Sequence, residues 1–208
     1  MSEQRIFSSE ELATLGKLTL ELVEDAVDAG ETEKAKKLSR RMYKEFLSMH
    51  DLYRDWVTAL LTFIGRRYGD SVLSEALRYG CQAWLEPLCD KYEGQDTRRK
   101  AQMMIAGLRG HLQAVTVEED DEKVTVVLDT CGSGGRLVEE GAYSPPRDFL
   151  RIHDPQPMTF GRSDFPVYCA HCHFQNCLPV ELRGKPLFVT EPAEAPGVEP
   201  CRIHLYKK

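Results

Sequence analysis

Residues 113–129 have the sequence QAVTVEEDDEKVTVVLD, and this stretch decides the fold class. Valine and threonine, which favour extended backbone, are concentrated in Gln113–Glu118 and Lys123–Asp129. The acidic segment Glu119–Glu122 separates the two runs. Two such runs joined by a short polar turn predict an antiparallel β-hairpin.

Upstream of the hairpin, apolar residues recur at helical spacing. A capping-box pattern at Ser8–Glu11 predicts the start of a helix, which Gly30 ends. Three further helices are predicted, over about 32–69, 70–87 and 96–112. In the first of these three, steps of three and four place one apolar face along the whole helix, formed by Leu38, Met42, Phe46, Met49, Tyr53, Val57, Leu60 and Ile64.

Downstream of the hairpin, a long proline-containing segment precedes one more helix and two strands. The helix is expected over Val167–Leu182, and the strands over Lys185–Thr190 and Cys201–Tyr206. Helices followed by mostly antiparallel strands define an α+β fold. We expect an N-terminal helical part, 1–112, packed on a C-terminal antiparallel sheet, 113–208, with one inserted helix that carries Cys and His. The two parts are expected to form one compact unit.

Composition narrows the possible partners. The chain has 208 residues and a net charge of −6, without the basic stripe that nucleic-acid binders carry, so no nucleic-acid partner is expected. The longest apolar run, Val57–Ile64, is too short to cross a bilayer, and Met1–Gln4 lacks signal-peptide character. We therefore expect a cytoplasmic protein without a membrane partner; a homodimer is the default oligomer. Seven cysteines, an odd number, in a reducing compartment are expected to be metal ligands or reactive thiols.

The segment Cys169-Ala-His-Cys172-His173 contains two cysteines and two histidines, which are potential metal ligands, within five residues. On a helix, Cys169, Cys172 and His173 would share one face, and thiolates with an imidazole suit zinc. Cys131, Cys201 or His50 would supply the fourth ligand. The alternatives are packing of buried thiols, a redox dithiol, an iron–sulfur cluster that also uses Cys177, and c-type haem attached at Cys-x-x-Cys-His.

A second segment, Cys131–Arg136, follows the predicted hairpin directly. Backbone amides in a glycine-rich turn can face an anion, and an arginine adds a fork for carboxylate or phosphate. The expected substrate-binding residues are therefore Gly132, Ser133, Gly134, Gly135 and Arg136. Cys131 is predicted to be a nucleophile or a metal ligand, and a plain tight turn with a buried cysteine is the alternative. His50 borders the apolar face of the long helix, where a histidine is either catalytic or simply packed.

The end of the chain, YCAHCHFQNCLPVELRGKPLFVTEPAEAPGVEPCRIHLYK, resembles the end of 4-vinyl-reductase-like small-molecule-binding domains. Gly184-Lys185-Pro186 and Gly197 to Cys201-Arg202 match that layout, over roughly the last hundred residues. The chain is similar too to the aminothiazoline-carboxylate-hydrolase-like group of that superfamily. The resemblance implies an α+β domain around a small-molecule pocket, with Cys201 as a ligand of a structural zinc. The acidic residue and cysteine that the family places before the glycine turn are here Glu191 and Glu194, without a cysteine.

Two functional hypotheses follow. The first is a small-molecule-processing enzyme of hydrolase or lyase type with an anionic organic substrate. In it, Cys131, Cys169, Cys172, His173 and Cys201 bind zinc or provide a thiolate, and Cys131, His50 and His173 are catalytic. The second is a non-catalytic small-molecule sensor with a structural zinc.

Overall fold

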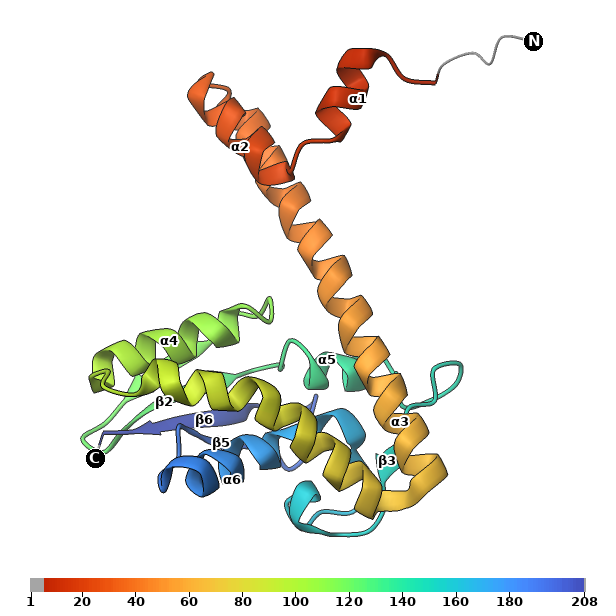
Figure 1. The fold of residues 1–208 in the computed structure, drawn as a ribbon, viewed down its shortest axis with the longest axis vertical. Coiled ribbons are helices and arrows are strands. Elements are labelled where there is room, and N and C mark those ends of the chain that lie inside the picture. The colour runs from red at the N-terminus through yellow and green to blue at the C-terminus, as the bar shows by residue number, and fades with distance from the viewer. Residues whose placement is uncertain (1–5, 208) are drawn as a thin grey trace. The chain divides into compact units, whose positions relative to one another are not determined.

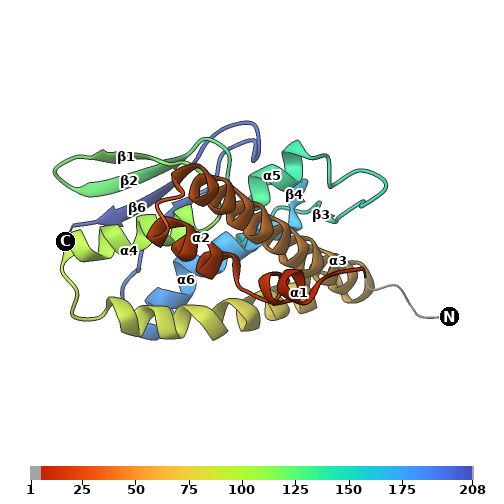
Figure 2. The ribbon, with the colours of Figure 1, turned by 90° about the horizontal axis from the view of Figure 1, so that it is seen from above.

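The predicted hairpin forms the first two strands of the sheet. In the computed structural model, which describes residues 6–207, β1 (Thr116–Glu119) pairs antiparallel with β2 (Lys123–Leu128), and Val117 lies opposite Val126. β2 pairs in turn with β6 (Cys201–Tyr206), and β6 pairs with β5 (Val189–Glu191). The result is a four-stranded antiparallel sheet of order β1-β2-β6-β5, with β1, β2 and β6 visible side by side in Figure 2. The α+β fold class is confirmed.

The chain divides into two units, residues 1–52 and 53–208. We describe each unit by itself. The helix α3 (Thr32–Tyr92) begins in unit 1 and continues in unit 2 (Figure 1). Residues 53–112 therefore belong to the same unit as the sheet. Residues Met1–Gln4, on which the absence of a signal peptide was predicted, lie outside the described residues.

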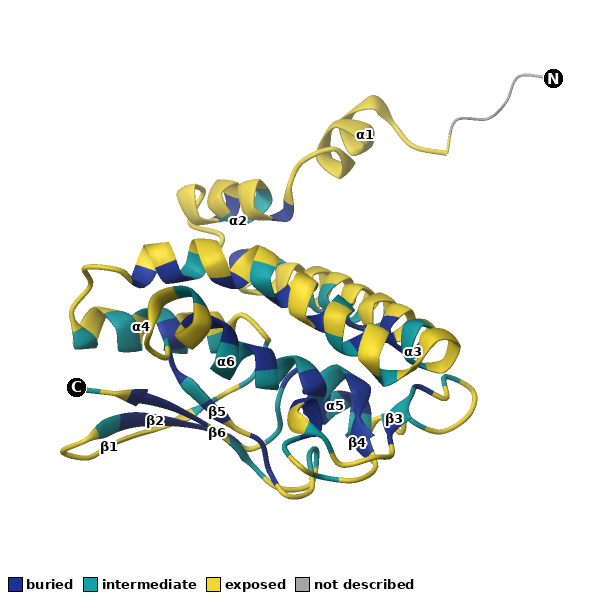
Figure 3. Ribbon diagram, turned by 60° about the horizontal axis from the view of Figure 1, so that its bottom comes forward, coloured by how far each residue is buried: buried dark blue, intermediate teal, exposed yellow. Residues whose placement is uncertain are grey.

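In unit 2, helices cover one face of the sheet. α4 (Thr97–Arg109) begins at Asp96, whose side chain accepts a hydrogen bond from the Arg99 amide. Its buried Met104 packs against Val126 of β2 and Ile203 of β6. Figure 3 shows this buried layer between the helices and the sheet. Val124, Val126 and Leu128 of β2, with Ile203 and Leu205 of β6, thus form the apolar surface on which the helical layer packs.

A second core joins α6 (His171–Arg183) to the latter half of α3. Leu77 and Leu85 of α3 pack with Phe174 and Leu178 of α6, and all four side chains are buried. Pro179 lies inside α6 and does not end it. α6 follows the short 3-10 helix η2 (Val167–Ala170), so the expected single helix from Val167 is two elements.

Several helix boundaries differ from the sequence prediction. The run from Ser8 to Gly30 is two helices, α1 (Ser9–Leu15) and α2 (Thr19–Asp28), because the chain turns at Gly16. The break predicted at Gly69 exists as a kink with φ 81°, which glycine adopts without steric cost. Pro87 does not end the third helix, since α3 continues to Tyr92.

The segment between β2 and α6 is more structured than its prolines suggested. It contains α5 (Gly134–Glu139), the 3-10 helix η1 (Pro157–Thr159), and a two-stranded sheet of β3 (Arg151–Ile152) and β4 (Phe165–Pro166). Leu137 of α5 is fully buried in a small core with Ala142 and Phe149. This packing fixes the segment beside the thiols described below.

Unit 1 consists of α1, α2 and the first part of α3. α1 begins with the predicted capping box, in which the Ser8 hydroxyl accepts from the Glu11 amide and the Glu11 carboxylate accepts from the Ser8 amide. α2 is joined to α3 by a hydrogen bond of 2.6 Å from Thr19 Oγ1 to Glu45 Oε2. Within residues 6–207, no helix is long and apolar enough to cross a membrane.

Candidate functional site

Four cysteines from separate segments converge in unit 2. Cys201 is the first residue of β6 and lies opposite Leu128, the last residue of β2. Cys131 is three residues beyond the end of β2 and is therefore at the same end of the strands as Cys201. Cys169 is in η2, and Cys172 is in the first turn of α6. We call Cys131, Cys169, Cys172 and Cys201 the thiol cluster; all four are partly buried.

Gly134 allows the close approach of η2 to the start of α5. A Cβ atom added to Gly134 would lie 2.7 Å from the Sγ atom of Cys169, closer than real Cβ atoms come to a neighbour. On the same turn, a Cβ atom on Gly135 would lie 3.3 Å from Cβ of Cys131. The glycines at these positions therefore make room for the cluster cysteines, a role that the predicted anion-binding turn did not include.

The thiols influence one another electrostatically. Burial raises the pKa of Cys169 well above its usual range, and the neighbouring Cys172, Cys131 and Cys201 raise it further. Burial also raises the pKa of Cys172 to about 12 and that of Cys201 to about 11. At neutral pH these three sulfurs are therefore protonated, and none is a thiolate nucleophile without a cation beside it.

The imidazole beside the cluster belongs to His171 rather than to His173. His171 Nε2 lies 3.8 Å from Cys172 Sγ, and the ring Nδ1 is bonded to the carbonyl of Tyr168. Burial lowers the pKa of His171, which keeps the ring neutral and able to bind a metal.

His173 lies in different surroundings. Its ring packs edge-on against Phe160 and Phe174, with centroids 5.9 and 5.2 Å away, and the nearby charge is that of Glu181. The sequence predicted that Cys169 and His173 lie on one α-helix. Because residues 167–170 form a 3-10 helix, Cys169 and His173 belong to different helices, and the α-helical spacing rule does not apply to them.

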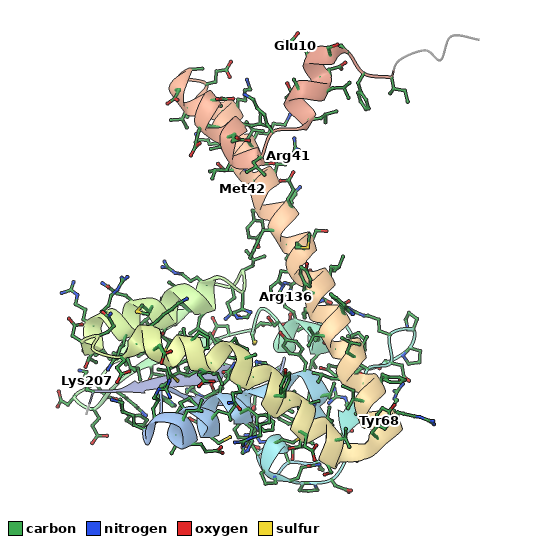
Figure 4. All side chains as sticks on the ribbon, viewed as in Figure 1. Glu10, Arg41, Met42, Tyr68, Arg136 and Lys207 are labelled. Atoms are coloured by element: carbon green, nitrogen blue, oxygen red, sulfur yellow. The ribbon has the colours of Figure 1, made fainter. Side chains whose placement is uncertain are left out.

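The glycine-rich loop uses its polar groups within the protein. The Gly132 amide donates to Gln113 Oε1, and Ser133 Oγ lies 2.8 Å from His111 Nδ1. Arg136 (Figure 4) donates to the Gly132 carbonyl at 3.2 Å and pairs with Glu140 at 3.3 Å. The loop is held rigidly next to Cys131, and its role as an anion site stays a prediction.

His50 belongs to unit 1. Its Nδ1 atom lies 3.0 Å from Asp51 Oδ1, and its side chain is largely buried. The structure therefore gives His50 an adjacent carboxylate, and its predicted role as a catalytic residue or metal ligand stays a prediction.

The donor types in the cluster suit a soft or borderline metal, because thiols and a neutral imidazole are the ligands that zinc prefers. Across residues 6–207, however, no group of three or more His, Cys, Asp or Glu side chains is already arranged to hold a metal ion. Binding would therefore require the thiols to rotate toward a common centre and to lose protons.

No family model, no curated protein and no solved structure matches the chain. The resemblance to 4-vinyl-reductase-like domains therefore stays a prediction.

Proposed function

We propose that the thiol cluster binds a zinc ion. The observation that carries the proposal is the convergence of Cys131, Cys169, Cys172 and Cys201 from three separate parts of the chain. A reducing, cytoplasmic location would keep these sulfurs available as ligands. A bound Zn²⁺ would replace the thiol protons and so stabilise the junction of β2, β6 and α6.

We further propose that this centre serves a small-molecule-processing enzyme of hydrolase or lyase type, with an anionic organic substrate. In that role the zinc would be held by three of the four sulfurs, and its open position would supply Lewis-acid polarisation of the substrate or an activated water. His171, adjacent to Cys172, is the imidazole closest to the cluster in this proposal. The loop from Gly132 to Arg136 would orient the substrate's anionic group next to Cys131.

A second candidate function is a small-molecule-binding protein in which the zinc is purely structural. One observation favours it. A cavity of about 300 Å³ in unit 2 is lined by Leu205 and Tyr206 at the end of β6, whereas Cys201 begins that strand. The cavity is therefore separate from the thiols, as expected where a metal stabilises the fold and a ligand binds elsewhere.

Metal analysis of untagged protein tests the zinc proposal. We expect about one zinc per chain in the native protein and loss of that zinc in Cys169→Ser and Cys201→Ser. Cys177→Ser is the matched control, because Cys177 is on α6 but interacts with Glu181 and Arg78 instead of the cluster. Metal-free native protein that takes up no added zinc would overturn the proposal.

Cobalt substitution separates the two functions. Structural zinc sites have four protein ligands, whereas catalytic sites keep one position open. In a catalytic site, added azide would change the visible absorption spectrum of the Co²⁺-loaded protein. An unchanged spectrum would assign the metal a structural role and leave the second function in place.

A further inference from the structure

The cavity in unit 2 has an apolar floor and a cationic rim. Its floor is formed by Tyr92 of α3, by Leu187 and Phe188, and by Leu205 of β6. Tyr92, Phe188 and Leu205 are buried parts of the fold, so the floor is preformed. The volume of about 300 Å³ is at the lower end of the range for small-molecule sites.

The rim carries four cations and one carboxylate. The cations are Lys100, Arg183, Lys185 and Lys207, and the carboxylate is Glu93. This is a local reversal of the chain's net charge of −6. A cavity with such a rim attracts small anions from solution.

Two of the four cations are already neutralised. Arg183 pairs with Asp90 at 2.7 Å, and Lys207 (labelled in Figure 4) pairs with Glu119 at 2.7 Å. Within residues 6–207, the ammonium groups of Lys100 and Lys185 have no hydrogen bond or ion pair. These two lysines, on α4 and on the segment after α6, are the groups left to bind a ligand.

We propose that this cavity binds a small organic carboxylate with an aromatic body. Tyr92 and Phe188 would contact the ring, and Lys100 and Lys185 would bind the carboxylate. Because the guanidinium fork of Arg183 is engaged by Asp90, the anionic end of the ligand would meet the two lysine ammonium groups. The space equals the liquid volume of about ten water molecules, enough for one ring and a short chain.

Calorimetric titration with 3-phenylpropanoate and with 3-phenylpropan-1-ol tests the site. The two probes share a body and differ in charge. We expect saturable binding of the acid, about tenfold tighter than binding of the alcohol. Equal affinity for the two, or no saturable binding of the acid, would overturn the proposal.

The double variant Lys100→Gln/Lys185→Gln identifies the binding groups. It should weaken binding of the acid about tenfold and leave binding of the alcohol unchanged. The control Lys37→Gln/Lys44→Gln removes the same charge from unit 1 and should change neither. Undiminished acid binding in the first double variant would overturn the assignment. None of these residues belongs to the thiol cluster, so the outcome is independent of the zinc proposal.

A second inference depends on a different observation, an exposed apolar stripe on α3. Met42, Phe46, Met49, Tyr53, Trp56, Leu60 and Phe63 follow one another at alternating steps of four and three. Their exposed fractions range from 38% for Met42 to 59% for Phe63. In unit 2 the other face of α3 is buried, at Arg54, Thr58 and Leu61. Such a period of 3.5 residues is typical of a helix that packs on another helix in a coiled coil.

We infer that the stripe is covered by the stripe of a second copy of this chain. All seven positions are uncharged, so two copies meet without like-charge repulsion, and a twofold dimer needs only one kind of surface. Four of the seven are aromatic and about half exposed. These rings alone expose roughly 300–500 Å², and with Met42, Met49 and Leu60 they approach the ~800 Å² per partner of a standard interface.

Sedimentation of the full chain tests the dimer. We expect a dimer for the native protein and a monomer for Met49→Glu/Trp56→Glu. The control Tyr79→Glu replaces an aromatic residue of α3 that is 83% exposed and outside the stripe, and it should stay dimeric. If the double variant loses helical circular dichroism, Leu60→Lys takes its place. A monomeric native protein, or a dimer that survives these substitutions, would overturn the inference.

Discussion

Unit 1 and unit 2 both contain long amphipathic helices but differ in what they bury. Among residues 6–52, only Thr19, Ala26 and Ala35 are buried, and all three are small. Unit 2 contains three apolar clusters, including fully buried Leu73, Leu85, Leu137 and Leu178. Figure 3 shows the same contrast, with α1 almost entirely exposed.

The contrast shows that helical periodicity predicts which face of a helix is apolar. It does not predict whether another part of the protein packs against that face. Leu12, Leu15 and Leu18 have the same spacing as core leucines, yet all three are exposed. Because burial of apolar area is the main stabilising contribution to folding, most of the folding free energy is expected to come from unit 2. Unit 1 requires a surface from outside itself, which the inferred dimer would provide.

The largest expected difference between the units comes from matched leucine substitutions. Leu178→Ala in unit 2 should lower the free energy of unfolding by about 3 kcal/mol, because it leaves a cavity in a packed core. Leu12→Ala in unit 1 should change it by less than about 0.5 kcal/mol, since Leu12 is half exposed. Urea denaturation of both variants measures these changes in the free energy of unfolding. Equal losses would show that the α1 leucine is buried in solution.

A smaller difference in the free energy of unfolding is expected when an ion pair of unit 2 and an ion pair of unit 1 are removed. Arg54 is buried, and the Glu140 carboxylate binds its guanidinium at 2.8 and 3.2 Å while also pairing with Arg147 at 3.1 Å. Glu140→Gln should therefore cost about 2 kcal/mol, because a buried cation loses its main partner. The exposed pair Arg41–Glu45 of unit 1, at 2.7 Å, should cost less than about 0.5 kcal/mol when Glu45 becomes Gln.

The contribution of Glu140 to the free energy of unfolding should decrease as the pH falls. Burial opposes ionisation, but the hydrogen bonds from Arg54 and Arg147 lower the pKa of Glu140 overall. A lowered pKa in the folded state means that the stabilisation is present above the ordinary carboxyl pKa and is lost as pH falls through the lowered value. The difference in unfolding free energy between native protein and Glu140→Gln should thus shrink in acid. A difference that is constant down to acid unfolding would contradict this account.

The sequence predicted the fold where local signals and packing agree. The hairpin, the capping box at Ser8–Glu11 and the break at Gly69 all depend on short-range chemistry, and all are present. The apolar face of the long helix was predicted too, but its exposure was not, because spacing carries no information on what lies opposite.

The residues of the candidate site were predicted more closely than their arrangement in space. Cys131, Cys169, Cys172 and Cys201 were each expected as ligands and do converge. His173 was expected with them, whereas His171 is the imidazole beside Cys172, because a 3-10 turn precedes α6. Pro166 directly before Val167 was the available signal that the first turn is irregular. The cationic cavity had no sequence signature, since its lysines come from segments 85 residues apart.

The smallest expected effect concerns helix caps. Asp96 caps α4 in unit 2, and Ser8 caps α1 in unit 1, each accepting a backbone hydrogen bond at 2.7 and 3.1 Å, respectively. Replacement of either by Ala removes about 1 kcal/mol of local helix stability. In Asp96→Ala this loss should appear in global unfolding, because α4 unfolds together with the core of unit 2. In Ser8→Ala it should appear only as faster amide hydrogen exchange in α1, with the global transition unchanged. A global loss in Ser8→Ala would mean that α1 is coupled to a packed core, and the contrast between the two units would then hold only for the isolated chain.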